Sequence, residues 1–261
     1  MRARRKRRTT RSGWRWALVL ALAAWVGYEA WTLPSGEELR ALESETPAET
    51  ALMRARKDEA VEKGRAARLA RRPVRASQVA PAVRAALVAS EDARFFEHEG
   101  FDLRQVHAAL RASVLEGKRL RGASTLTQQL AKNLYLSESR SVLRKLKELW
   151  IAWRMERTLS KRRILELYLN VVEWGDGVFG IEAAARAHLK KSASQVDLAE
   201  AAALVAMLPN PHRIGPRNPR VLHRRALHVL ERVENERLAA PAEIERARER
   251  LAGWLVPLSD A

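Results

Sequence analysis

The sequence reads Glu91-Asp92-Ala93-Arg94-Phe95-Phe96-Glu97-His98-Glu99-Gly100-Phe101-Asp102, and about twenty residues later it reads Gly122-Ala123-Ser124-Thr125-Leu126-Thr127-Gln128-Gln129-Leu130-Ala131-Lys132-Asn133. In order, these two runs give a carboxylate pair, aromatic side chains, a histidine, a glycine turn and an uncharged polar helix start. Packing alone does not require this order, because a core is built from periodic apolar faces. We therefore interpret the two runs as the centre of a chemical site.

The composition favours helices over strands. The chain has 261 residues, in which Gly (12) and Pro (10) are sparse while Ala, Leu, Arg and Glu dominate. These abundant residues are good helix formers. The length is enough for one core domain with appendages.

The charge balance predicts an anionic partner. The formal net charge is +17, and eight basic residues with no acidic one lie in residues 1–16, so the remainder still carries +9. Phosphate, a lipid surface and nucleic acid are the partner classes that fit. The chain has no cysteine, which excludes disulfides, thiolate chemistry and a cysteine-based zinc site.

The N-terminal segment predicts export from the cytoplasm. Residues 1–15 form a basic tail, and residues 16–33 are predicted to be a transmembrane anchor with Trp and Tyr at its flanks. Its charge-free core has 13 residues and reaches 18 only if Glu29 lies in the outer interface, whereas a spanning helix wants about 20. One alternative is a signal peptide cleaved after Ala21-Leu22-Ala23, although the apolar core before that site is short, and another is a buried helix. Residues 34–72 are expected to form a juxtamembrane stalk, helical in parts.

Apolar spacing of three to four residues then predicts an all-α domain. Helices are expected from Pro81 to about Ser90, from about Leu103, and from Thr125, where Gln128 completes a capping-box pattern. The later helices are expected at an apolar stripe of Leu143, Leu146, Leu149, Trp150 and Trp153, after the N-cap Ser160, and at about 179–189, 197–208, 219–239 and 241–254. No strand is predicted.

The Glu91-Asp92 pair is the candidate catalytic centre. Two carboxylates at the C-terminal end of a helix oppose the helix dipole, which favours cations there. A general base held near neutral pH by burial explains the pair, and an ordinary surface pair is the alternative. Phe95 and Phe96 either line a sugar site or anchor the loop. His98 alone is interpreted as a structural histidine rather than a metal ligand.

Two further groups indicate a site for a phosphorylated substrate. Gln129, Lys132 and Asn133 share one helix face, which suits a sugar amide and a phosphate or is simply solvated. Arg144 and Glu148 are spaced i,i+4 in the poorer orientation, so helix stabilisation explains them badly. A cationic helix directed at a pyrophosphate explains them better. Nucleic acid is not favoured, because no nucleic-acid-binding motif accompanies the basic residues.

Taken together, these runs resemble glycosyltransferase family 51, the peptidoglycan glycosyltransferases, and in particular its monofunctional biosynthetic branch. The similarity covers about residues 74–220. The matching motifs are Glu91-Asp-x-x-Phe95 with His98-x-Gly100, Gly122 to Gln129 with Lys132-Asn133, Arg144-Lys145-x-x-Glu148, Ile164-Leu-Glu166-x-Tyr168-Leu-Asn170, and Phe179-Gly180 to Glu182-Ala-Ala.

The resemblance implies a lysozyme-like helical glycosyltransferase domain over residues 73–220, followed by a helical extension at 221–261 that packs on it. It implies a single-pass enzyme of the bacterial inner membrane with its catalytic domain in the periplasm. The expected reaction polymerises lipid II into β-1,4 glycan strands, with inversion and release of undecaprenyl pyrophosphate. The expected partners are lipid II, the lipid-linked growing glycan, the membrane and other cell-wall synthesis proteins, and not nucleic acid.

By the same resemblance, Glu91 matches the general base and Glu148 a second carboxylate. The substrate-binding positions are expected to be Asp92, Phe95, Ser124, Thr125, Gln129, Lys132, Asn133, Arg140, Arg144 and Lys145. No resident metal ligand is predicted and no cofactor is required, although the resemblance allows a divalent cation (Mg or Mn) at the pyrophosphate.

Two departures and two alternatives complete the sequence-based interpretation. The segment His188-Leu189-Lys190-Lys191 stands where many relatives have an aromatic pair followed by Gly-Lys, and no Ser-x-x-Lys or Lys-Thr-Gly motif of a transpeptidase occurs.

A lytic glycan-cleaving enzyme on a related fold is the first alternative, but it has no need of cations at a leaving pyrophosphate. A membrane-tethered polyanion binder is the second, and it leaves the Glu91 run unexplained.

Overall fold

A computed structural model describes residues 13–67, 69–107, 111, 124–137 and 141–254. Its helices are α1 (Gly13–Trp31), α2 (Gly36–Ala41), α3 (Ala51–Glu62), α4 (Pro81–Glu91), α6 (Leu126–Tyr135), α7 (Val142–Thr158), α8 (Lys161–Val171), α9 (Ile181–Ala184), α10 (Leu198–Met207), α11 (Pro219–Asn235) and α12 (Pro241–Gly253). Two 3-10 turns, Ala76–Gln78 and Ala193–Gln195, and a π-helical turn, Ala185–Leu189, are also present, and residues 103–107 are helical, where a helix was predicted to begin. The described part of the chain is therefore mostly helical, as predicted.

A small sheet, which the sequence did not predict, joins two distant segments. Strands β1 (Ala70–Arg71), β2 (Glu173–Gly175) and β3 (Val178–Phe179) pair in the order β1-β3-β2, with β1 parallel and β2 antiparallel to β3. Strands of two or three residues are too short to show an alternating pattern. Asp176 and Gly177 form the β2–β3 connection.

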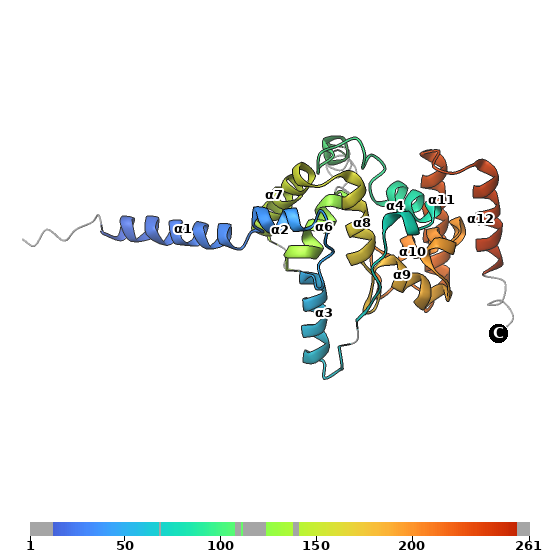
Figure 1. The fold of residues 1–261 in the computed structure, drawn as a ribbon, viewed down its shortest axis with the longest axis horizontal. Coiled ribbons are helices and arrows are strands. Elements are labelled where there is room, and N and C mark those ends of the chain that lie inside the picture. Colours follow the sequence, from blue (N-terminus) through green and yellow to red (C-terminus); the bar gives the residue numbers. More distant parts are fainter. Residues whose placement is uncertain (1–12, 68, 108–110, 112–123, 138–140, 255–261) are drawn as a thin grey trace, which may run out of the picture.

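The core is centred on α10. Every residue of α10 is buried, and the helix packs against α4, α11 and α12, while α6 packs against α7 and α8. Figure 1 shows α4, α10, α11 and α12 gathered at one end of the domain and α6, α7 and α8 beside them, with α1 extending away. The C-terminal extension is packed on the domain as expected, because Ala226, Val229, Leu230 and Val233 of α11 belong to the core.

The predicted stalk, residues 34–72, is partly helical and lies against the domain. Leu39 of α2 and nearby Leu42 belong to the same core as residues of α4, α6 and α8, and Met53 of α3 is also buried. These three apolar side chains are divided between α2 with its C-cap and α3, so they form no continuous apolar stripe. The sequence therefore did not reveal this packing.

The N-terminal prediction has a mixed outcome. Helix α1 covers most of the segment predicted as an anchor, residues 16–33. Within the described residues, no helix combines the length and apolar character that crossing a membrane requires.

Helix α7 differs from its predicted orientation. Leu146, Trp150 and Trp153 were assigned to its apolar stripe, but all three are exposed, and Ile151, Ala152 and Met155 face the core instead. Periodicity identifies an apolar face without saying what covers it.

Candidate active site

Glu91 is the last residue of α4, and it accepts a hydrogen bond from the side chain of Gln129 on α6. Gln129 Nε2 lies 3.0 Å from Glu91 Oε2, and Tyr168 of α8 donates its hydroxyl to Gln129 Oε1 at 2.9 Å. Because Tyr168 donates to the amide oxygen, the amide nitrogen of Gln129 faces the carboxylate. Three helices thus orient one half-buried carboxyl group.

The surroundings of Glu91 favour its neutral form. Burial raises the pKa of Glu91 above its ordinary value, while the hydrogen bond from Gln129 and the charge of Arg232 act in the opposite direction and Asp92 adds to the rise. Burial and the nearby Glu91 also raise the pKa of Tyr168 well above its usual range, so Tyr168 stays a neutral donor. A carboxyl group with a raised pKa is suited to accepting a proton near neutral pH.

Asp92 links the loop that follows α4 to the start of α6. It is buried, and its Oδ2 accepts a hydrogen bond from the backbone N–H of Leu126 at 2.9 Å. His98 Nε2 lies 2.9 Å from Oδ1, and His98 Nδ1 accepts the backbone N–H of Gly100 at 3.2 Å. This pattern assigns a neutral imidazole that donates through Nε2. Asp92 therefore caps α6 and fixes the loop, and His98 is structural as predicted.

Gly100 allows this loop to lie close to α7. Its φ of +93° belongs to the left-handed region, and an added Cβ would lie 3.2 Å from Glu156 Cγ and 3.3 Å from the carbonyl oxygen of Ala152. The Gly100 carbonyl accepts hydrogen bonds from Thr125 Oγ1 at 2.6 Å and from Gln128 Nε2 at 3.3 Å. Thr125 is fully buried and also accepts the N–H of Gln128, so it acts as an N-cap rather than as a surface group.

A second polar centre is built around Glu148 of α7. Glu148 is buried, and its two oxygens accept hydrogen bonds from Arg144, at 2.9 Å, and from Lys145. Lys145 Nζ also donates to Ser124 Oγ at 3.0 Å and to Gln128 Oε1 at 3.2 Å. Two cations around one carboxylate leave a net positive charge on this cluster, which can stabilise an anionic group.

Helix α6 connects the two centres. The adjacent residues Gln128 and Gln129 direct their amides to Lys145 and to Glu91, respectively. The sequence predicted the reciprocal capping box from Gln128, but its side chain bonds to Gly100 and Lys145 instead. One short helix therefore contacts both Glu91 and the cationic cluster.

The remaining predicted site residues lie in different environments. Phe95 is fully buried, with Lys161 Nζ 4.5 Å above its ring, and Asn133 is also buried, whereas Lys132 is exposed. Arg140 lies outside the described residues. Phe95 and Asn133 thus support the walls of the site and present little surface to a substrate.

A basic groove beside Glu91 was missed by the sequence reasoning. It has a volume of about 430 Å³ and is lined on one side by Ser90 and Glu91 and on the other by α11 residues that include Arg224, Arg225, His228 and Arg232. Arg232 also donates to the carbonyl of Ser90 at 2.8 Å. The sequence signal that could have revealed this groove is the run of basic residues on the polar face of the amphipathic helix α11. Cations on such a face can border a cleft as well as solvent.

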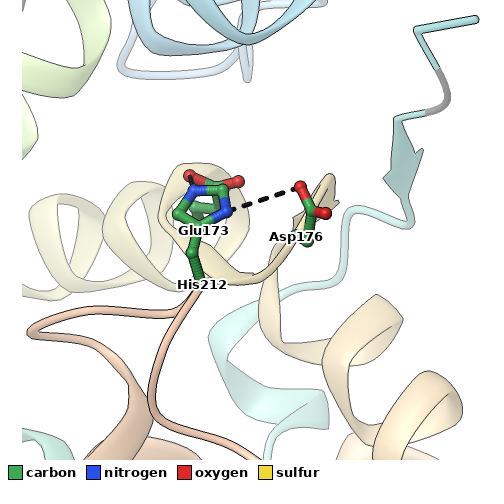
Figure 2. Close-up of side chains that lie close together, drawn as sticks. All are labelled: Glu173, Asp176 and His212. Carbon is green, nitrogen blue, oxygen red and sulfur yellow. Dashed lines mark ion pairs between the residues drawn. The ribbon is translucent and has the colours of Figure 1, made fainter. Parts of the chain in front are cut away.

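A cluster that could hold a metal lies in a different part of the fold. Figure 2 shows His212 beside Glu173 and Asp176, with its Nε2 3.4 Å from Glu173 Oε2 and its Nδ1 3.4 Å from Asp176 Oδ1. Glu173 is buried and already accepts hydrogen bonds from Arg56 Nε at 2.9 Å and from the Gly177 N–H at 3.2 Å. Each imidazole nitrogen faces a different carboxylate, so we interpret the cluster as an ion-pair network joining α3 to the β2–β3 hairpin.

The oxygens of Glu148 are each engaged by a side-chain cation, Arg144 or Lys145. The positive charge of these two groups opposes the approach of a divalent cation to this carboxylate.

Comparison with known proteins identifies the family. The family model described as Transglycosylase matches residues 58–234. A biosynthetic peptidoglycan transglycosylase from Azoarcus sp. is 44% identical over 211 residues, covering 78% of this chain and 90% of the relative. Proteins of the same description from Chromobacterium violaceum (48% identical, 58% of this chain and 70% of the relative) and Methylobacillus flagellatus (43% identical, 76% and 85%) are also similar. The chain belongs to the transglycosylase family and is a peptidoglycan glycosyltransferase.

Proposed function

We propose that the enzyme polymerises lipid II by an inverting transfer in which Glu91 is the general base. Glu91 takes the proton of the sugar 4-hydroxyl on the acceptor lipid II. The freed oxygen attacks C1 of the growing chain, the bond from C1 to the pyrophosphate oxygen breaks, and a β-1,4 linkage forms. Undecaprenyl pyrophosphate leaves with the electron pair of the broken bond.

The observation that carries this proposal is the pairing of Glu91 with a neutral amide beside a separate cationic cluster. Gln129 orients the Glu91 carboxylate without neutralising it, and burial raises the Glu91 pKa. Charge that develops on the leaving pyrophosphate needs preorganised cations rather than an acid. Arg144 and Lys145, which Glu148 holds in place, supply them.

The basic groove supports a second anionic contact. Arg224 and Arg225 line the space next to Glu91 on the side formed by α11. We assign this groove to a phosphorylated portion of a lipid-linked substrate, because two guanidinium groups suit phosphate recognition. Lys132 and Arg140 remain proposed pyrophosphate-binding residues through the family resemblance.

We also propose that α1 inserts into the membrane, with the basic residues 1–15 on the cytoplasmic side and the helical domain outside. The support is the surface of α1, where Trp14, Leu18, Leu20, Leu22 and Trp25 are all exposed, together with the one-sided basic tail. A lipid-linked substrate requires the enzyme to work at a membrane.

The test is polymerisation of labelled lipid II by the purified full-length protein, with products resolved on a gel. The proposal predicts a ladder of glycan products. If a folded, detergent-solubilised protein gives no ladder but cleaves finished peptidoglycan, the lytic alternative holds and the proposed reaction is wrong.

A further inference from the structure

The last turn of α4 contains no basic residue, although the helix ends in two carboxyl groups, Glu91 and the C-cap Asp92. Carbonyl groups in the last turn of a helix lack partners within the helix and carry partial negative charge. This charge disfavours an ionised carboxylate at Glu91, in addition to the burial described above. A base has to be ionised before it can accept a proton, so a cation at this end of α4 would favour its action.

Arg232 of α11 brings such a cation from a distant part of the chain. Its Nη1 donates a hydrogen bond to the carbonyl oxygen of Ser90 at 2.8 Å, and Ser90 belongs to the last turn of α4. Helices α4 and α11 pack against each other, and Figure 1 shows them side by side. Arg232 therefore satisfies a carbonyl of this turn and places a positive charge at the end of α4 that holds Glu91.

The groups that face Glu91 from the other elements do not supply a positive charge. Gln129 of α6 is a neutral amide, and Tyr168 of α8 is a neutral hydroxyl that contacts Gln129. Asp92, the neighbour of Glu91, is negative and adds to the rise of the Glu91 pKa. The positive charge of Arg232 lowers the pKa of Glu91, against the larger effect of burial.

The remaining basic side chains of α11 in the groove have other surroundings. Arg224 and Arg225 are assigned above to a phosphorylated portion of the substrate, and His228 Nδ1 lies 3.0 Å from Glu231 Oε2 on its own helix. Arg232 differs because its guanidinium is bonded to the backbone of α4. Its charge is therefore fixed relative to Glu91.

Substrate binding should strengthen the effect of Arg232. The side chain is exposed in the free protein, where water screens the interaction between charges. A substrate that fills the groove of about 430 Å³ beside Glu91 displaces this water. Because Coulomb interactions strengthen as the local dielectric constant falls, the influence of Arg232 is largest in the enzyme–substrate complex, when Glu91 has to be ionised.

We propose that Arg232 is a positioning residue for Glu91, which fixes the last turn of α4 from α11 and keeps the Glu91 carboxylate ionised once substrate occupies the groove. The inference rests on the proposed role of Glu91 as the general base. Helix α11, for which the sequence indicated only packing on the domain, then contributes to the active site.

The first test is the pH dependence of the polymerisation rate at saturating lipid II, which reports ionisations in the enzyme–substrate complex. In Arg232→Gln, loss of the positive charge should raise the pKa of Glu91, so the acidic limb should move to higher pH. The rate should fall several-fold on that limb and much less on the plateau. Arg232→Lys keeps the charge and should retain the parental limb. An unmoved limb in Arg232→Gln, or an equal shift in both variants, would overturn the proposal.

Arg225→Gln is the matched control, because it removes the same charge from the same groove. It should raise the lipid II concentration that gives the half-maximal rate and leave the acidic limb in place. An equal shift of the limb in Arg225→Gln would show that the groove acts through its total charge, which contradicts a specific role for Arg232.

A measurement without turnover separates this inference from the proposed reaction. Carbon-13 NMR of the full-length protein in detergent micelles observes the side-chain carboxyl carbon of Glu91, identified by its absence in Glu91→Gln. Its titration should move to higher pH in Arg232→Gln and stay in place in Arg225→Gln. An unmoved titration would overturn the role of Arg232, whatever the reaction. A shifted titration with parental polymerisation by Glu91→Gln would refute the proposed base and still support the action of Arg232 on Glu91.

Discussion

Glu91 and Glu148 are two carboxylates on either side of helix α6, which contacts Glu91 directly and Glu148 through Lys145. Their hydrogen-bond partners differ in charge. Glu91 is approached by a neutral amide, from Gln129, and burial raises its pKa. Glu148 is bonded by two cations, Arg144 and Lys145. The first arrangement leaves a carboxylate free to take a proton, and the second uses a carboxylate to fix positive charge. In the proposed mechanism, the site thereby separates proton transfer from leaving-group stabilisation.

The largest expected effect is that of Glu91→Gln. The substitution keeps the shape and the contact with Gln129 but removes the proton acceptor, so polymerisation should fall on the order of 10²–10⁴-fold. Gel-resolved turnover of labelled lipid II measures the loss. Glu99→Gln, on the exposed loop that follows, is the matched control and should retain parental activity. A parental rate for Glu91→Gln would remove Glu91 from the role of base.

The same substitution should not cost stability. Because the pKa of Glu91 is raised in the folded state, the stability linked to this group is fully present below its unfolded pKa. It is lost as pH rises through the folded pKa. A neutral glutamine avoids that loss, so at pH 7 Glu91→Gln should unfold at the parental temperature or above it. A clear drop in the melting temperature would contradict the burial argument.

Glu148→Gln should affect stability and activity together. It leaves two cations facing each other across a buried site, which is expected to lower the free energy of unfolding by about 1–3 kcal/mol. Polymerisation should fall by one to two orders of magnitude, about the worth of one misplaced charge contact. Denaturant unfolding and turnover measure the two effects. The control is Glu156→Gln, also on α7, which breaks the pair of Glu156 with Lys161 of α8. It should cost stability but leave activity per folded molecule nearly unchanged.

Gln129→Ala should change the pH dependence of the rate. The hydrogen bond from Gln129 lowers the pKa of Glu91 against the larger effect of burial, so its removal should raise that pKa further. The base works only when deprotonated, and the acidic limb of the pH–rate profile should therefore move to higher pH. Gln128→Ala is the control, because Gln128 contacts Lys145 instead, and it should leave the acidic limb in place. An unmoved limb in Gln129→Ala would mean that another group controls it.

Tyr168→Phe should give the smallest effect. It removes the hydroxyl that holds the Gln129 amide, worth about 0.5–1.5 kcal/mol, and retains the buried ring. We expect a rate loss of less than about tenfold by the same arithmetic, and an acidic limb shifted in the same direction as in Gln129→Ala but by less. A shift toward lower pH would show that Tyr168 does not act through Gln129.

Local signals predicted much of this site. The caps Thr125 and Ser160 begin their helices as the sequence indicates, and α4 ends at Glu91. The Arg144–Glu148 pair was identified from its unfavourable orientation, and it forms. Such features depend on residues close in sequence, whose spacing fixes their geometry.

The features that were missed depend on contacts between distant segments. Tyr168 reaches Gln129 across 39 positions of the chain, and Arg232 of α11 reaches the end of α4 across 142. The sheet pairs residues near 70 and 178 through very short strands. Leu146, Trp150 and Trp153 of α7 were assigned to the core because an apolar period does not reveal whether other parts of the fold cover it.

The most direct test of the division of labour is to measure turnover and unfolding free energy for Glu91→Gln and Glu148→Gln under the same conditions. We expect Glu91→Gln to lose nearly all polymerisation without losing stability and Glu148→Gln to lose part of both. If Glu148→Gln abolishes turnover at parental stability while Glu91→Gln keeps polymerising, the two carboxylates have the reverse roles and the central claim is wrong.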